Sequence, residues 1–298
     1  MFKSRIAPTP SGYLHIGNAC NFLITWLWTR AENAPLFLRI DDLDRSRKRP
    51  EYVEDIFQTL KWLGLDWDEG PSGPEDFEKN WSQHLRLDHY TQALEHLKEQ
   101  GLLFACDCTR SQIMEQSENG QYTGRCYDRA LDFDAHQLAW RVRTDPLVHV
   151  QWQDAWQGRL SMSLGDRMQD FVVRRKDKIP AYQLASVVDD RLFGISAVLR
   201  GEDLLSSTTA QIWLDQQLAD PRLNRVRWAH HPLLVDQARQ KLSKSAGSQS
   251  ILAMRNSGAK ASTIYEACAN LMGWSGKFNS LEQLLEHYIR RPKITYDP

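Results

Sequence analysis

The sequence predicts an α/β fold built on a parallel sheet. Short apolar runs at 2–7 and 35–40 are typical of buried strands. The stretch 18–30 between them is apolar almost all round, as expected for a helix enclosed in a core. An amphipathic helix follows at 51–63, with Pro50 at its start and Gly64 after its end. Since strands and helices alternate, a parallel sheet is favoured.

The rest of the chain divides into an insertion and a helical end. A further amphipathic helix carries Leu87 and Leu97 and ends at Gly101, and a mixed α+β stretch follows over 104–180. The sheet is predicted to resume at 183–188 and 195–199, before a helix at 207–218 and a helical region from Ile251 onward. The predicted domains are a main α/β domain (1–85 and 183–228), an insertion (86–182), and a loop with a short helical region (229–298).

Composition excludes several classes of protein. A chain of 298 residues is long for one compact domain and suits a catalytic domain with an insertion. The net charge of −1 argues against bulk, non-specific nucleic-acid binding. The longest apolar stretch near the N-terminus, 22–28, is too short to span a bilayer. We therefore expect a cytoplasmic protein with no membrane partner.

Two motifs indicate a nucleotide site. The segment 5–18 (RIAPTPSGYLHIGN) follows a strand and opens a helix, whose N-terminus favours a phosphate. Within it, His15 can donate a proton to a phosphate oxygen, and Gly17 lets a nucleotide approach the backbone. The second motif is 241–245 (KLSKS), in which Lys241 and Lys244 flank small residues. Such a loop can neutralise a pyrophosphate leaving group.

This pair resembles the HIGH and KMSKS signatures of class I aminoacyl-tRNA synthetases. The segments 39–44 (RIDDLD), 181–185 (AYQLA), 187–190 (VVDD) and 199–203 (LRGED) are similar to glutamyl-tRNA synthetase segments in the same order. The resemblance covers essentially the whole chain. It implies a Rossmann-like catalytic domain that uses ATP and Mg²⁺ to activate L-glutamate as an acyl-adenylate.

The resemblance also implies roles for individual residues. An arginine fork pairs bidentately with a carboxylate, so Arg5 and Arg200 suit the side-chain carboxylate of glutamate, while Asp41 faces its ammonium. His15 and Lys244 are the implied catalytic residues. The implied glutamate-binding set is Arg5, Ile6, Ala7, Pro8, Thr9, Asp41, Tyr182 and Arg200, and the ATP-binding set is His15, Gly17, Asn18, Lys241 and Lys244. The alternatives are that Arg5 and Arg200 are surface arginines and that Asp41 pairs with a neighbouring arginine.

The sequence departs from full-length glutamyl-tRNA synthetases. Asp41 stands where glutamate is usual, Cys20 where arginine is usual, and Ser186 where asparagine is frequent. Those synthetases also continue into an all-helical anticodon-binding region, which we expect to be absent. The shortened form resembles the glutamyl-queuosine tRNA(Asp) synthetase family. The implied acceptor is then the queuosine at the wobble position of tRNA(Asp), presented by its anticodon stem-loop to a monomeric enzyme.

Other acceptors and activities stay open at this point. The alternatives are a short glutamyl-tRNA synthetase that charges a 3′ end and a glutamate-activating ligase with a non-tRNA acceptor. A nucleotidyltransferase and an inactive RNA-binding relative are further alternatives. If RNA binds, phosphate contacts are expected from Arg174 and Arg175.

The cysteines predict a metal site. Cys106, Cys108 and Cys126 lie in one polar region, and three thiolates there suit a structural Zn²⁺ ion. The truncated family implies Tyr122 as the fourth ligand, whereas the residue types alone also allow His136 or a water. Three free thiols are the alternative. Cys20 and Cys268 are expected to be small core residues.

Overall fold

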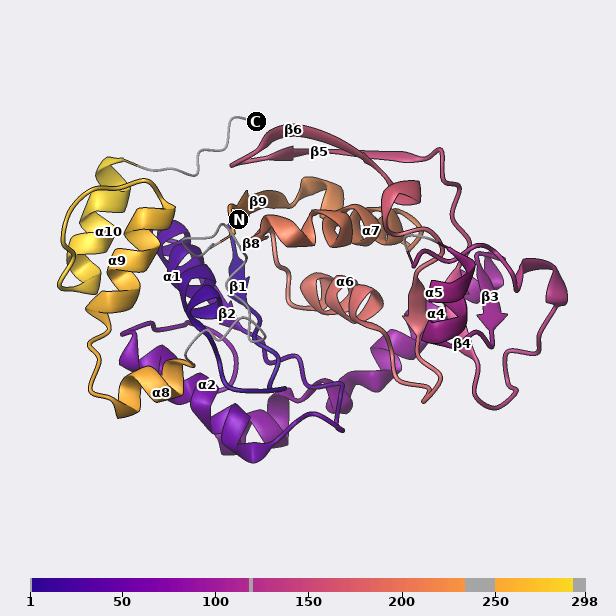
Figure 1. Ribbon diagram of the computed structural model, residues 1–298, viewed down its shortest axis with the longest axis horizontal. Helices are drawn as coiled ribbons and strands as arrows, with labels where there is room; N and C mark the ends of the chain where they lie inside the picture. The colour runs from indigo at the N-terminus through magenta and orange to yellow at the C-terminus, as the bar shows by residue number, and fades with distance from the viewer. Residues whose placement is uncertain (1, 118–119, 234–249, 292–298) are drawn as a thin grey trace.

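The protein is described here by a computed structural model, which covers residues 2–117, 120–233 and 250–291 (Figure 1). Its α-helices are α1 Ile16–Ala31, α2 Pro50–Trp62, α3 Pro74–Asp76, α4 Leu87–Glu99, α5 Arg110–Gln116, α6 Tyr182–Leu192, α7 Leu205–Gln216, α8 Ile251–Asn256, α9 Ser262–Leu271 and α10 Leu281–Arg290. Its strands are β1 Ser4–Ile6, β2 Leu36–Leu38, β3 Leu103–Cys106, β4 Ala139–Val142, β5 His149–Asp154, β6 Gly158–Ser163, β7 Val172–Arg174, β8 Ala197–Gly201 and β9 Arg227–His231.

Parallel strands form the centre of the molecule, as predicted. β1 pairs with β2 in parallel, with Arg5 opposite Phe37, and β8 pairs with β9 in parallel. The two pairs are joined at Lys3, whose carbonyl oxygen accepts from the N–H groups of Ser196 (2.9 Å) and Ala197 (3.0 Å). The carboxyl ends of β1 and β8 therefore lie close together, which is where parallel sheets bind ligands.

Helices cover this sheet at the end of the molecule opposite the insertion. Figure 1 shows α9 and α10 beside α1, and all three contribute to one hydrophobic core. Ten of the 16 residues of α1 are buried, including every residue from Phe22 to Thr29, in line with its apolar sequence. Cys20 and Cys268 are both in this core. The predicted helical region after Ile251 is thus confirmed by α8, α9 and α10.

The insertion is centred on a separate antiparallel sheet, β3–β4–β7, with α4 and α5 against it (Figure 1). The division of the chain into domains stays a prediction, but one hairpin crosses the predicted boundary. β5 and β6 fall within 86–182, yet β5 pairs with β9 of the central sheet at Asp154 and Trp228. The main sheet therefore includes part of the predicted insertion.

One secondary-structure prediction is wrong. The run 183–188 was expected to be a strand, but it lies in the helix α6. Every residue from Gln183 to Asp190 is buried, so the run shows no polar face that would reveal a helical period. Its two acidic residues, Asp189 and Asp190, are buried because arginines pair with them.

No helix within the described residues is long and apolar enough to cross a bilayer.

Candidate active site

A cavity of about 390 Å³ opens at the carboxyl ends of β1, β8 and β9 and at the start of α1. It brings together residues that lie far apart in the sequence. The predicted site residues that line it are Arg5, Ala7, Pro8, Thr9, His15, Gly17, Asn18, Asp41, Tyr182 and Arg200. The side chain of Ile6 instead belongs to the hydrophobic core. Lys241 and Lys244 lie outside the described residues.

Arg5 projects from β1 and is buried, so it is not a surface arginine. Its Nε donates to Oδ1 of Asp190 at 3.1 Å. The same oxygen accepts from Nη1 of Arg39 at 2.6 Å. One carboxylate on α6 therefore orients two guanidinium groups at the cavity.

Asp41 pairs with a neighbouring arginine, which is the alternative left open by the sequence. Its Oδ1 lies 2.6 Å from Nε of Arg39, and its Oδ2 lies 3.1 Å from Nη2. Burial raises the pKa of Asp41, although the charge of Arg39 acts in the opposite direction. Asp41 still lines the cavity, so its carboxylate belongs to both the ion pair and the site.

Asp190 and its neighbour Asp189 are structural partners that the sequence analysis did not assign. Asp189 accepts from Nε of Arg86 (2.8 Å), the hydroxyl of Tyr90 (2.7 Å) and the amide of Gln83 (2.9 Å). The sequence did contain a signal for these buried ion pairs. Two adjacent acidic residues end an apolar run, and a charge that is buried there needs a partner.

Arg200, at the end of β8, is also buried. Its Nε and Nη2 donate to the hydroxyl of Thr208, at 3.1 and 2.5 Å. No carboxylate pairs with it among the described residues, and its buried Nη1 has no hydrogen-bond partner there. Burial lowers the pKa of Arg200 to about 10, so the group stays charged at neutral pH. An anion in the cavity would complete this site.

His15 is the N-cap of α1, and this role determines which ring nitrogen accepts a hydrogen bond. Its Nδ1 accepts from the N–H of Gly17 at 3.1 Å, while Oδ1 of Asn18 accepts from the N–H of His15 at 3.1 Å. A Cβ atom at Gly17 would lie only 3.0 Å from the ring, so glycine gives the imidazole its space. Because Nδ1 is an acceptor, the neutral ring carries its proton on Nε2.

The remaining walls of the cavity come from Tyr182 and from two segments around the second motif. Tyr182 starts α6 and its side chain is largely exposed at the cavity. His231 and Leu233 line the cavity just before the undescribed residues 234–249. Just after them, Ser250 forms an isolated antiparallel bridge with His15. The described residues on either side of 234–249 are therefore close to the cavity.

The three clustered cysteines come together as predicted. The sulfur atoms of Cys106, Cys108 and Cys126 all lie within 4.8 Å of one another and are buried. The hydroxyl of Tyr122 accepts from the N–H of Cys126 at 2.7 Å, which places a fourth donor atom beside the sulfurs. His136 is exposed and does not belong to the cluster. Three thiol sulfurs with one oxygen suit a tetrahedral, sulfur-rich metal site.

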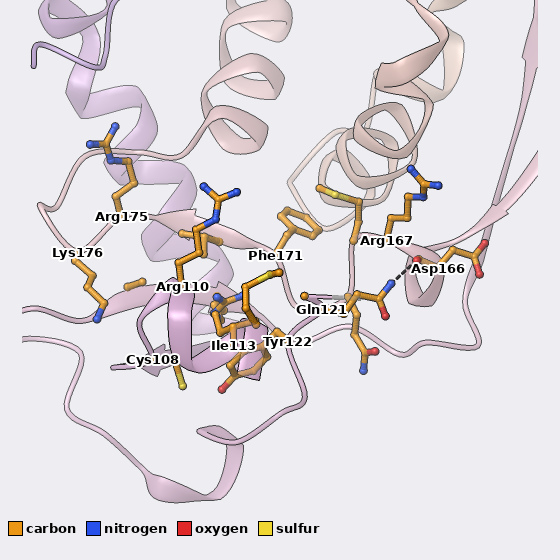
Figure 2. A pocket seen from close by; sticks show the side chains of 17 residues that line it. Cys108, Arg110, Ile113, Gln121, Tyr122, Asp166, Arg167, Phe171, Arg175 and Lys176 are labelled. Carbon is orange, nitrogen blue, oxygen red and sulfur yellow. Dashed lines mark hydrogen bonds between the residues drawn. The ribbon is translucent and has the colours of Figure 1, made fainter. Parts of the chain in front are cut away.

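A larger cavity, of about 940 Å³, lies beside these cysteines in the insertion (Figure 2). We call it the insertion groove; its basic lining residues are Arg110, Arg141, Arg167, Arg175 and Lys176. Figure 2 shows the guanidinium groups of Arg110, Arg167 and Arg175 on one side of the groove. Arg110 and Arg167 are exposed and make no side-chain hydrogen bond within the described part of the chain. The groove therefore carries a positive surface.

Residues 1–288 match the family of class I tRNA synthetases (E and Q), catalytic domain. The chain belongs to this family. It is 37% identical to glutamate–tRNA ligase 2 of Halorhodospira halophila over 92% of the chain and 57% of that protein. It is 38% identical to the glutamyl-Q tRNA(Asp) synthetase of Symbiobacterium thermophilum over 92% of the chain and 87% of that protein. The chain thus spans a little over half of the glutamate–tRNA ligase it matches.

A solved structure agrees with the family's fold. The glutamate–tRNA synthetase of Elizabethkingia anophelis superposes with a TM-score of 0.78 at 21% identity. The match covers 96% of this chain and 65% of that one. The predicted class I catalytic fold, α/β with a parallel sheet, is confirmed.

Proposed function

We propose that the chain activates L-glutamate with ATP as glutamyl-adenylate and transfers the glutamyl group to queuosine at the wobble position of tRNA(Asp). The activation of glutamate is supported above all by Arg200, a buried guanidinium at the cavity with no carboxylate partner among the described residues. A buried charge without a partner is costly, so a substrate carboxylate is its natural complement.

The pocket suits an amino acid with a second carboxylate. Arg200 offers Nη1, and Arg5 lies close enough that its charge lowers the pKa of Arg200 further. A carboxylate between the two guanidiniums would relieve that repulsion. Asp41 supplies the opposite charge for the ammonium group. Because Arg39 already holds Asp41 bidentately, the ammonium shares this carboxylate.

The first step is attack of the α-carboxylate oxygen of glutamate on the α-phosphorus of ATP, with pyrophosphate as the leaving group. His15 directs its Nε2 proton away from the cap and donates to an α-phosphate oxygen. Lys244 and Lys241 are assigned by their motif to the departing pyrophosphate. ATP enters as its Mg²⁺ complex, which supplies further neutralisation of the phosphate charge.

The second step is attack of an acceptor hydroxyl on the carbonyl carbon of the adenylate. An ester bond forms, AMP leaves, and the hydroxyl proton passes to the AMP phosphate or to solvent. The enzyme provides no covalent nucleophile, so its contribution is positioning and charge stabilisation.

A structural zinc ion fits the cysteine cluster. Cys106, Cys108 and Cys126 would hold it, with the hydroxyl of Tyr122 as the fourth ligand. The cluster joins β3 to the loop that precedes β4, so an ion there would fix one wall of the insertion groove.

Two observations support tRNA(Asp) as the partner. The relative from Symbiobacterium thermophilum, matched over most of its length, bears that name. The insertion groove has the charge to follow an RNA backbone, and an anticodon stem-loop is a short A-form stem with a single-stranded end. Arg110, Arg167 and Arg175 are the phosphate contacts we assign. Arg174 is less suited than predicted, because its guanidinium packs over Trp140 at 4.1 Å.

The test is transfer of labelled glutamate to tRNA from a strain that makes queuosine and from one that does not. Labelling of the first tRNA alone supports the proposal. Equal labelling of both, or a label that maps to the 3′ ribose, would show a short tRNA-charging enzyme instead. Labelling of neither, with glutamate-dependent pyrophosphate exchange intact, would indicate a non-tRNA acceptor.

A further inference from the structure

A chain of three buried side chains lies behind Arg200, on the side away from the substrate cavity. It runs from Asp154 at the end of β5, through His230 on β9, to Thr208 on α7. All three are almost fully buried, and none of them lines the cavity. Burial of an acid, a base and a hydroxyl is costly unless each has a defined partner.

The positions of the protons follow from the contacts. Asp154 is ionised, because hydrogen bonds from His230, Gln157 and Trp156 outweigh burial and lower its pKa. A carboxylate only accepts, so the short contact of 2.5 Å between its Oδ2 and Nδ1 of His230 requires a proton on Nδ1. Burial also lowers the pKa of His230, so the ring is neutral. Its Nε2 is then an acceptor.

The hydroxyl of Thr208 links His230 to Arg200 by hydrogen bonds. Both lone pairs of its hydroxyl are used by Nε and Nη2 of Arg200. The hydroxyl proton therefore points away from the guanidinium, and the nearest acceptor is Nε2 of His230 at 2.6 Å. Nε of Arg200 also lies 3.4 Å from Nε2. The carbonyl of Leu204, at 3.2 Å, is the more distant choice for the hydroxyl proton.

We propose that Asp154, His230 and Thr208 are positioning residues that fix the guanidinium of Arg200 so that Nη1 is left for the substrate carboxylate. The geometry carries this assignment, which rests on the proposed function of Arg200 as the glutamate ligand. The indole of Trp228 supports the same orientation, with the guanidinium carbon 4.9 Å from its ring centre. The hairpin β5–β6 thus contributes to the site through Asp154, without entering the cavity.

The tautomer of His230 decides whether the hydroxyl of Thr208 is free to accept from Arg200. In Asp154→Asn, Oδ1 still accepts the backbone N–H groups of Trp156 and Gln157, which turns the amide NH₂ toward Nδ1. His230 must then move its proton to Nε2, and that proton competes with Arg200 for the hydroxyl of Thr208. The shape of the site stays the same, and only the direction of the hydrogen bonds changes.

The kinetic test uses glutamate-dependent ATP–pyrophosphate exchange. Thr208→Val and Asp154→Asn should each raise the KM for glutamate by about 10- to 100-fold, the loss expected for hydrogen bonds to a charged group. The kcat and the KM for ATP should not change, because Arg200 holds a part of the substrate that does not react. Thr208→Ser keeps the hydroxyl and should restore the wild-type KM. Thr209→Val is the matched control, since the hydroxyl of this buried neighbour donates to the carbonyl of Leu205 and to no side chain among the described residues.

A second measurement reads the tautomer directly. Nitrogen-15 NMR of the imidazole of His230 should show the proton on Nδ1 in the wild type and on Nε2 in Asp154→Asn. An unchanged KM in folded Thr208→Val, or a wild-type proton on Nε2, would overturn the proposal. If the wild type shows no exchange with glutamate, the proposed function fails, while the NMR result still decides the hydrogen-bond direction.

Discussion

The carboxylate of Asp41 grips the guanidinium of Arg39 with both oxygens, at 2.6 and 3.1 Å. A second carboxylate, Asp190, holds the other end of the same guanidinium at 2.6 Å. The acidic side of the cavity is therefore built on an arginine that lines the cavity and already has two carboxylate partners. Removing the charge of Asp41 would leave Arg39 paired with Asp190, but it would remove the group that we assign to the substrate ammonium.

Asp41→Asn should raise the KM for glutamate by about tenfold or more, because a partly desolvated ion pair to the ammonium is lost. The KM for ATP should stay unchanged. Pyrophosphate exchange at varied glutamate and varied ATP measures both constants. Asp220→Asn, an exposed acid paired with Arg222, is the control. Equal kinetics for Asp41→Asn and the wild type would remove Asp41 from the substrate site.

His15→Asn separates the two uses of His15. Asparagine is a good N-cap, so its side-chain oxygen can replace Nδ1 and keep α1 capped. The Nε2 proton is lost, and kcat for adenylate formation should fall by about 10²–10³-fold with little change in melting temperature. His15→Ala should lose the same activity and also about 1 kcal/mol of stability. Near-full exchange activity in the asparagine variant would show that the imidazole serves only as a cap.

Lys244→Ala tests the second motif. The same fall of about 10²–10³-fold in kcat is expected, because one donor to the developing negative charge is removed. Glutamate binding, measured by calorimetry without ATP, should be unaffected. A variant that keeps its exchange rate would show that the lysine is dispensable.

Protein purified without added metal should contain one zinc ion per chain by elemental analysis. Cys108→Ser should lose this ion and unfold at a lower temperature, whereas Cys268→Ser, in the main core, should keep it. Tyr122→Phe should bind zinc more weakly if the hydroxyl is the fourth ligand. A stably folded wild-type protein without metal would contradict the site.

Burial lowers the pKa of His231, whose Nδ1 donates to the carbonyl of Pro232 at 2.7 Å. The unfolded chain therefore binds a proton at this residue near pH 6.5 that the folded chain does not bind until lower pH. Its contribution to the free energy of unfolding is complete above pH 6.5 and is lost as the pH falls below it, by at most about 1.4 kcal/mol per pH unit. Urea unfolding at pH 7 and pH 5 should show a smaller pH effect in His231→Asn, whose amide can keep the bond to Pro232. An identical pH effect in both proteins would mean that His231 titrates normally.

Much of the site was predictable because its residues belong to short motifs at strand and helix ends. Arg5 and Arg200 lie on strands near their carboxyl ends, and His15 caps the helix that follows β1, which is where parallel sheets bind ligands. Their motifs are also contiguous in sequence. The acidic partners of the buried arginines were not predictable in the same way. Asp190 meets Arg39 across 151 residues, and no local pattern specifies such a pair. The helix α6 was mistaken for a strand for the same reason, since those distant arginines bury its acidic residues.

The pairing of β5 with β9 has a practical consequence for protein engineering. Excising residues 86–182 as one cassette would remove a strand of the central sheet together with Asp154. A swap that aims to change only the RNA partner must therefore exchange two pieces, one before β5 and one after β6, and leave the hairpin in place. The segments that we assign to the acceptor and those that we assign to the amino acid are therefore interleaved along this chain, and an exchange has to respect that order.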